Sequence, residues 1–216
     1  MSLSKDPLNV IIAGVGGQGN VMASQLIGRA LVRESYYVTI GDTYGASQRG
    51  GAVMSHLRIS RDSQFSPLIP EGQADLIVAL EPVEALRVIA QYGNPSTSAV
   101  INSRPIYPTA VTVGDAQYPS LDKIKETIHE LARKSWFVDA TEIALSLGAP
   151  IFTNIIMVGA LAGTELLPLP RKAYEDTIRE SFSEPHLEDN LNAFAKGVEL
   201  TGRGAKSRER RAESME

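Results

Sequence analysis

The sequence predicts an α/β protein with three layers (α/β/α) around a mostly parallel, mixed sheet. Short apolar runs with β-branched residues alternate with amphipathic helical stretches along most of the 216 residues. A glycine-rich turn separates the first predicted strand from the first predicted helix. The strand predicted at residues 52–59 follows a loop rather than a helix, so we expect part of the sheet to pair in antiparallel fashion.

The first strand and helix form a Rossmann-like βα unit around this turn. Residues 9–13 (NVIIA) read as a buried strand, and apolar residues recur at helical spacing over residues 18–33. Free backbone N–H groups at residues 18–20 would attract a phosphate, a carboxylate or a partner's carbonyl. A tight turn for helix–strand packing explains the same glycines. The glycines of this turn are Gly14, Gly16, Gly17 and Gly19, and Gln18 lies between the last two.

The turn also fits a dinucleotide-binding fingerprint, with glycines at positions 14, 16 and 19 between a strand and a helix. Asp42 follows the second strand, residues 37–40, near the place of a ribose-binding carboxylate. A free-standing NAD(P)-binding oxidoreductase is therefore an alternative. Against it, the sequence shows no Tyr–Lys pair or His–carboxylate couple at a recognisable spacing.

A second glycine loop, Gln48-Arg49-Gly50-Gly51, follows the second strand and leads into an alternating run at residues 53–59. The alternation predicts a strand with one wet or interface face. The planar guanidinium of Arg49 suits a carboxylate, a phosphate or a partner backbone. A surface arginine in a turn is equally consistent with the sequence.

The rest of the chain continues the strand–helix alternation. His129 falls on the polar side of its helix and is expected to be solvated. Asp139 or Thr141 would cap the next helix. Asn154 would cap a helix or form a hydrogen bond to a loop. Strands are predicted at residues 74–80, 98–102, 111–113 and 136–138, and helices at 82–90, 120–134, 139–148, 153–166, 170–182 and 187–197.

Composition narrows the function. The chain has no cysteine, so it cannot hold a thiolate-ligated iron–sulfur cluster, a disulfide or a cysteine zinc site. Its three histidines show no metal-ligand spacing, and a net charge of −4 argues against a nucleic-acid partner. We find no apolar run of membrane-spanning length and no signal-peptide pattern, and therefore expect a cytoplasmic protein. Residues 1–200 are predicted to form one domain and residues 201–216 a disordered tail.

The two glycine loops together resemble the gamma-type domain of 2-oxoacid:ferredoxin oxidoreductases. The resemblance rests on GVGGQG at residues 14–19, the Gln-Arg-Gly-Gly loop and SHLR at residues 55–58. ASQRGGAV at residues 46–53, with Ser55-His56, resembles more narrowly the small (beta) subunits of indolepyruvate ferredoxin oxidoreductases. Weaker matches at residues 139–144, 154–160 and 192–197 extend the resemblance over residues 9–200.

This resemblance implies a chain that is inactive alone and has no catalytic residue of its own. It would complete or cover the active site of a large subunit that carries thiamine diphosphate, Mg²⁺ and iron–sulfur clusters. The complex would oxidise an aryl pyruvate such as indolepyruvate, with ferredoxin as electron acceptor and coenzyme A as acyl acceptor. A purely structural partner subunit is the other alternative. The expected active-site-proximal residues are Gly14, Gly16, Gly17, Gln18, Gly19, Gln48, Arg49, Gly50, Gly51, His56 and Asn154.

Overall fold

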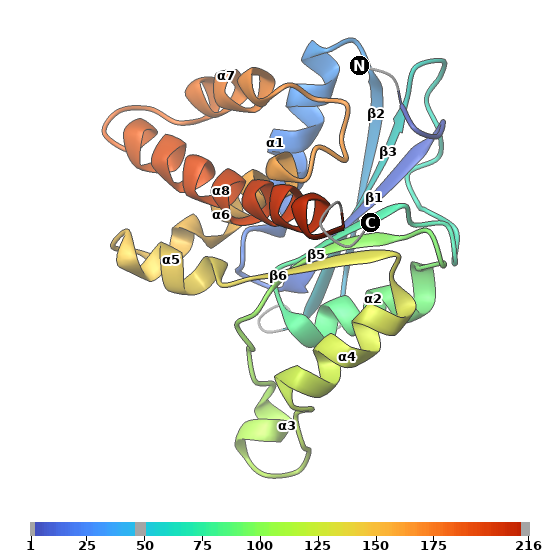
Figure 1. Cartoon of the computed structure of the whole chain (residues 1–216), viewed down its shortest axis with the longest axis vertical. Helices are drawn as coiled ribbons and strands as arrows, with labels where there is room; N and C mark the ends of the chain where they lie inside the picture. Colours follow the sequence, from blue (N-terminus) through green and yellow to red (C-terminus); the bar gives the residue numbers. More distant parts are fainter. Residues whose placement is uncertain (1–2, 46–50, 213–216) are drawn as a thin grey trace.

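The computed structural model describes residues 3–45 and 51–212, with side chains up to residue 202. Its centre is a six-stranded sheet in the order β2-β3-β1-β4-β5-β6 (Figure 1). The strands are β1 (Leu8–Val15), β2 (Tyr37–Tyr44), β3 (Ala52–Ser60), β4 (Leu76–Ala79), β5 (Ser98–Asn102) and β6 (Lys134–Val138).

The sheet is mixed, which confirms the prediction from the loop before residue 52. Strands β1, β4, β5 and β6 run parallel, whereas β3 lies between β1 and β2 and is antiparallel to both. In this register Ile11 of β1 lies opposite His56 of β3, which in turn lies opposite Gly41 of β2. The carboxyl ends of β1, β2, β4, β5 and β6 therefore meet at one edge of the sheet.

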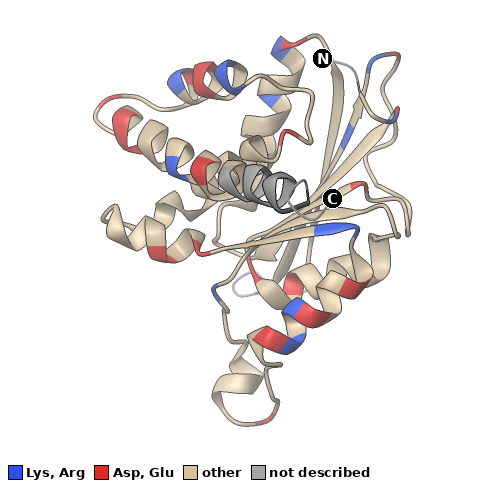
Figure 2. Ribbon diagram, viewed as in Figure 1, with Lys and Arg blue, Asp and Glu red and all other residues tan. Residues whose placement is uncertain are grey.

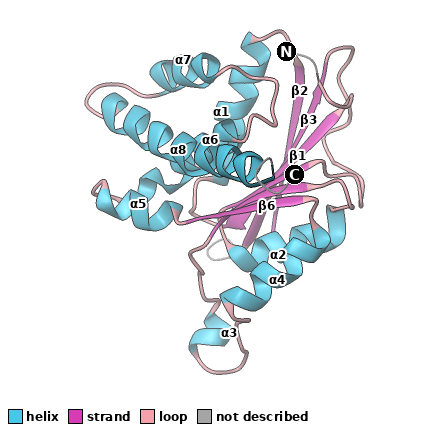
Figure 3. Ribbon diagram, viewed as in Figure 1, coloured by secondary structure: helices cyan, strands magenta, loops and turns pink. Residues whose placement is uncertain are grey.

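Helices cover both faces of the sheet and give the three layers (Figure 3). Two buried apolar clusters lie on the two faces, one under α1, α6, α7 and α8 and the other under α2 and α4. The short helix α3 projects away from the body (Figure 1). The helices are α1 (Asn20–Arg33), α2 (Pro82–Tyr92), α3 (Thr109–Thr112), α4 (Leu121–Leu131), α5 (Ala140–Ser146), the 3-10 turn η1 (Pro150–Phe152), α6 (Thr153–Gly163), α7 (Arg171–Ser181) and α8 (Leu187–Ala212).

Helix α6 is the most deeply buried helix, and its glycines permit close contact with α8. A Cβ at Gly159 would overlap the carbonyl oxygen of Phe194 and lie 3.0 Å from the Cα of Gly197, so a side chain here would force the two helices apart. Thr201 of α8 adds a hydrogen bond from its hydroxyl to the carbonyl of Ala160, at 2.7 Å. This packing holds α6 closely against α8.

Two segments differ from the sequence-based prediction. The edge strand predicted at residues 111–113 is wrong, because Pro108 begins a helical turn in which Thr112 N–H donates to the carbonyl of Pro108 at 3.1 Å. Hydrogen bonds between residues four apart in the sequence form without a partner strand. Here they outweigh the preference of the two valines for a β-strand. Helix α8 ends at Ala212, further along the chain than the helix predicted at residues 187–197, whereas the disordered tail predicted at residues 201–216 stays a prediction.

Candidate functional site at the carboxyl edge of the sheet

The first glycine loop is stabilised by the side chain of Gln18. Its Oε1 accepts a hydrogen bond from Val15 N–H at 2.7 Å, and its Nε2 donates to the carbonyl of Leu80 at 2.9 Å. Gln18 thereby joins the ends of β1 and β4. A Cβ at Gly14 would lie 2.6 Å from Gln18 Oε1, so that this glycine leaves room for the side chain.

The second glycine loop meets the first through the backbone. Gly16 N–H donates to the carbonyl of Gly51 at 2.9 Å, and Asn20 Nδ2 donates to the carbonyl of Val53 at 3.3 Å. The structure therefore brings Gly51 to the first loop. Three predicted site residues, Gln48, Arg49 and Gly50, lie outside the described residues.

A cavity of about 770 Å³ opens beside the first loop, at the carboxyl ends of the parallel strands. Ligands bind at this edge in open α/β sheets. Three segments of the chain form its walls: the turn after β1, the loop after β5, and the residues from α5 to the start of α6. Its lining residues are Gly17, Gln18, Gly19, Met22, Arg104, Pro105, Ile106, Thr141, Pro150, Ile151, Thr153 and Asn154.

Two kinds of hydrogen-bond donor face this cavity. Helix α1 begins after Gly19, whose φ is 85°, and no side chain caps its first N–H groups. Asn154, which is only 7% exposed, lies against Gly19. Its Oδ1 accepts from Ile155 N–H at 2.8 Å, whereas its Nδ2 has no hydrogen-bond partner among the described residues. An anionic group in the cavity would satisfy these donors.

Asn102, which the sequence analysis did not select, joins two of the segments beside the cavity by hydrogen bonds. Asn102 is fully buried at the end of β5, and its Nδ2 donates to Leu80 O at 3.1 Å and to Thr141 Oγ1 at 2.9 Å. The Leu80 carbonyl thus accepts from both Gln18 and Asn102. The available signal was a polar residue at the carboxyl end of an otherwise apolar strand. Arg104 follows and forms an exposed ion pair with Glu142 at 2.8 Å.

Exposed apolar side chains surround the cavity. Ile151 is 75% exposed and Met22 is 43% exposed, and Ile106 also reaches the surface. Large apolar groups gathered at the entrance of a polar cavity are typical of a protein–protein contact. This arrangement favours a cavity that a partner covers over one that faces solvent.

A buried carboxylate holds the Ile106 wall of the cavity. Glu81 is 2% exposed and accepts hydrogen bonds from Tyr118 O–H, from Glu84 N–H at 2.8 Å and from Ile106 N–H at 3.3 Å. Burial raises the pKa of the Glu81 carboxyl above its usual range, and burial together with the Glu81 contact raises the pKa of Tyr118. Glu81 thus joins both ends of the projecting α3 segment to the body.

His56, another predicted site residue, is not brought to the cavity. It is 1% exposed in the middle of β3, where its Nδ1 accepts from Ile69 N–H at 3.3 Å and its ring meets the edge of Tyr92. Burial lowers the pKa of His56, which keeps the imidazole neutral. In this position the ring contributes to packing under the loop after β3.

The geometry removes the basis of the dinucleotide alternative. In a Rossmann unit the second strand lies directly beside the first, which brings its terminal acid close to the ribose. Here β3 lies between β1 and β2, so that Asp42 is one strand further away. Asp42 accepts a hydrogen bond from Ser55 Oγ at 2.5 Å and does not line the cavity.

The mixed sheet flanked by helices and the glycine turn after β1 define an α/β domain of the doubly wound class. The chain belongs to the pyruvate ferredoxin/flavodoxin oxidoreductase family, whose model matches residues 9–200. This confirms the resemblance that the two glycine loops indicate.

Individual relatives support the same assignment. The indolepyruvate oxidoreductase subunit IorB of Archaeoglobus fulgidus is 40% identical over 190 residues, which cover 88% of this chain and 93% of the relative. The pyruvate/ketoisovalerate oxidoreductases common subunit gamma of Pyrococcus furiosus is 32% identical over 90% of this chain and 97% of the relative.

Solved structures share the fold. Pyruvate oxidoreductase subunit PORC of Thermotoga maritima superimposes with a TM-score of 0.68 at 22% identity, over 91% of this chain and 97% of that chain. The 2-oxoglutarate:ferredoxin oxidoreductase of Magnetococcus marinus, solved with 2-oxoglutarate, coenzyme A and succinyl-CoA bound, gives a TM-score of 0.70 at 22% identity. It matches 92% of this chain but only 31% of its own chain. In the part of our chain that the structure describes, no helix is long and apolar enough to cross a membrane.

Proposed function

We propose that the chain is the small subunit of a 2-oxoacid:ferredoxin oxidoreductase, and that it completes the active site of a large subunit. The observation that most supports this proposal is the cavity at the carboxyl edge of the sheet. There, unsatisfied N–H donors of Gly19 and Asn154 lie inside a ring of exposed apolar side chains. The relatives that share this domain are themselves named as subunits of oxidoreductases. The dinucleotide alternative is not favoured, since Asp42 lies away from the cavity.

The residues of this chain do not fit every cofactor of the family. A thiolate-held cluster has no ligands here, because the chain has no cysteine. Among the described residues, no three His, Asp or Glu side chains gather as metal ligands. We therefore propose that thiamine diphosphate, which supplies the electron sink for decarboxylation, lies with Mg²⁺ and the clusters on the large subunit.

The donors of the cavity fit an anionic group. We propose that the α1 N-terminus and Asn154 Nδ2 bind a carboxylate or phosphate of a molecule at the subunit boundary, with coenzyme A as the candidate acyl acceptor. The guanidinium of Arg104 lies at the cavity rim, where it is paired with Glu142. Met22, Ile106 and Ile151 would contact the large subunit and exclude water from the bound group. Ferredoxin would then receive the electrons from the partner's clusters.

The substrate is proposed to be an aryl pyruvate such as indolepyruvate. Relatives named as indolepyruvate oxidoreductase subunits are 34–40% identical to this chain, compared with 32% for the Pyrococcus furiosus pyruvate/ketoisovalerate subunit. A cytoplasmic location is part of the same proposal.

The test is reconstitution with the large thiamine-dependent subunit. We expect the isolated chain to be colourless and inactive, and the complex to reduce ferredoxin when indolepyruvate and coenzyme A are present. Asn154→Asp keeps the acceptor for Ile155 N–H but removes the free donor and adds a negative charge. It should lower turnover at least tenfold at equal assembly, whereas Asn190→Asp on α8, a buried asparagine outside the cavity, should not.

Two results would decide for the alternatives. Micromolar NADH binding by the isolated chain, abolished by Asp42→Ala, would indicate a dinucleotide enzyme. Full activity of the Asn154→Asp complex and of the Arg49→Ala complex would indicate a purely structural subunit, since neither residue would then affect turnover.

A further inference from the structure

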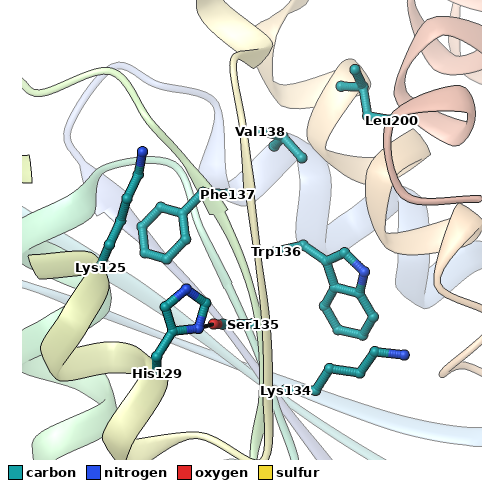
Figure 4. A pocket seen from close by; sticks show the side chains of 8 residues that line it. All are labelled: Lys125, His129, Lys134, Ser135, Trp136, Phe137, Val138 and Leu200. Atoms are coloured by element: carbon teal, nitrogen blue, oxygen red, sulfur yellow. Dashed lines mark hydrogen bonds between the residues drawn. The ribbon is translucent and has the colours of Figure 1, made fainter. Parts of the chain in front are cut away.

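Strand β6 forms one end of the sheet and, within the described strands, pairs only with β5. Its outer side therefore offers backbone N–H and C=O groups to another chain. A groove of about 330 Å³ follows this edge, on the opposite side of β5 from the glycine loops. Its lining residues are Lys125, His129, Lys134, Ser135, Trp136, Phe137, Val138 and Leu200 (Figure 4).

Each face of the edge presents one lysine beside one aromatic ring. Figure 4 shows Lys125 and Phe137 on one side of the strand and Lys134 and Trp136 on the other. The Nζ of Lys125 lies 5.7 Å from the centre of the Phe137 ring, and the Nζ of Lys134 lies 4.7 Å from the Trp136 ring.

Neither lysine is neutralised within the part of the chain that the structure describes. No acidic side chain there forms an ion pair with Lys125 or Lys134. Lys123, two residues before Lys125 on α4, is paired with Glu126 at 3.2 Å. Figure 2 shows acidic and basic residues mixed along α4. Lys125 and Lys134 differ from Lys123 in that no carboxylate of the described residues pairs with them, which leaves their positive charges available at the β6 edge.

Two of the lining side chains, Ser135 and His129, contact each other beside the edge. Ser135 Oγ bonds His129 Nδ1 at 2.7 Å, and the His129 ring packs against the edge of Phe137. His129 was predicted to be merely solvated. It is exposed, as predicted, but it also ties the end of α4 to β6.

We propose that the outer edge of β6 binds an extended acidic segment of a partner protein, which adds a seventh strand to the sheet. Acidic side chains on the two faces of the added strand would reach Lys125 and Lys134, and apolar ones would cover Phe137 and Trp136. Lys134 on the edge strand and Lys125 beside it on α4 would repel a second copy of the same edge, so the surface selects an acidic segment and opposes self-association. Backbone pairing would supply affinity, and the charges would supply specificity.

Trp136 is the only tryptophan of the chain and therefore reports directly on this groove. We would titrate the full-length chain with a blocked octapeptide, Val-Glu-Glu-Val-Val-Glu-Glu-Val, and follow tryptophan fluorescence. Controls are the same peptide with lysine in place of glutamate and the same peptide with N-methyl groups on alternate amides, which cannot pair as a strand.

The expected result is a saturable shift with the acidic peptide that salt weakens. Lys125→Gln and Lys134→Gln should each reduce affinity about threefold and the double variant about tenfold, as for exposed ion pairs. Lys123→Gln, on the same helix but outside the groove, should bind as the parent does. The proposal is overturned if no saturable shift occurs, if the basic peptide binds equally well, or if N-methylation leaves affinity unchanged.

Discussion

The side chain of Asn154 lies directly against Gly19, so that the start of α6 and the start of α1 are held in contact. A Cβ at Gly19 would lie 3.0 Å from Asn154 Cγ and closer still to Nδ2. Since α6 is buried against α8, this contact connects the glycine loop to the buried core of the molecule. The free amide donor of Asn154 and the N–H groups of α1 therefore face the same cavity.

Gly19→Ala should destabilise the chain more than Gly17→Ala. Both glycines have positive φ, 85° and 97°, so either substitution strains the backbone by about 1–2 kcal/mol. A Cβ at Gly17 meets no atom within 4 Å, whereas one at Gly19 meets Asn154. Adding Asn154→Ala to Gly19→Ala should recover the difference in urea unfolding. Equal losses for the two single variants would contradict the close contact.

Gln18→Glu should lower the free energy of unfolding by about 1–3 kcal/mol, because the carbonyl of Leu80 loses a donor and faces a carboxylate instead. Gln25→Glu, at an exposed position of α1, is the control and should cost less than about 0.5 kcal/mol. If thermal or urea unfolding does not separate the two variants, Gln18 does not join β1 to β4.

Tyr118→Phe should loosen the segment that carries α3. Loss of the hydroxyl leaves the buried Glu81 carboxylate with fewer donors, which costs about 1–2 kcal/mol. Hydrogen exchange of residues 106–117 should then accelerate. Tyr107→Phe keeps the ring that packs against Tyr118, removes the hydroxyl of an exposed residue, and should leave exchange unchanged. Unaltered exchange in Tyr118→Phe would show that other contacts hold the segment.

Because of His56, the free energy of unfolding should decrease as the pH is lowered below about 6.5. Its pKa in the folded state is lowered from 6.5 by burial, so below pH 6.5 the unfolded chain binds a proton that the folded chain does not. The stabilisation is complete above the unfolded pKa and is lost as pH falls. Between pH 7.5 and 5.5 the parent should lose more stability than His56→Gln, which keeps an acceptor for Ile69 N–H. Parallel pH profiles in urea unfolding would refute a depressed pKa.

Much of the fold was predictable because its signals are local. The β-branched run before Gly14, the helical spacing after Gly19 and the alternation in β3 each indicate an element by residues close in sequence. Antiparallel pairing of β3 followed from the loop before it. The strand predicted at residues 111–113 failed because two valines carry too little information against the turn that Pro108 begins.

The site was only partly predictable because it depends on distant contacts. Gly14, Gly19 and Gly51 were selected from their motifs, and the structure brings these loops together. Asn102 and the Glu81–Tyr118 pair were missed, since nothing near them in sequence reveals which groups they bond. His56 was selected through the family resemblance, and its position in the middle of β3 shows only in the folded chain.

The central claim is that the large subunit covers the cavity at the carboxyl edge. Hydrogen exchange of this chain, measured with and without the large subunit, tests it most directly. The account predicts slower exchange at residues 16–22, 104–107 and 150–155 in the complex, over the three walls of the cavity. Unchanged exchange at all three segments in a fully assembled complex, with protection elsewhere, would contradict it.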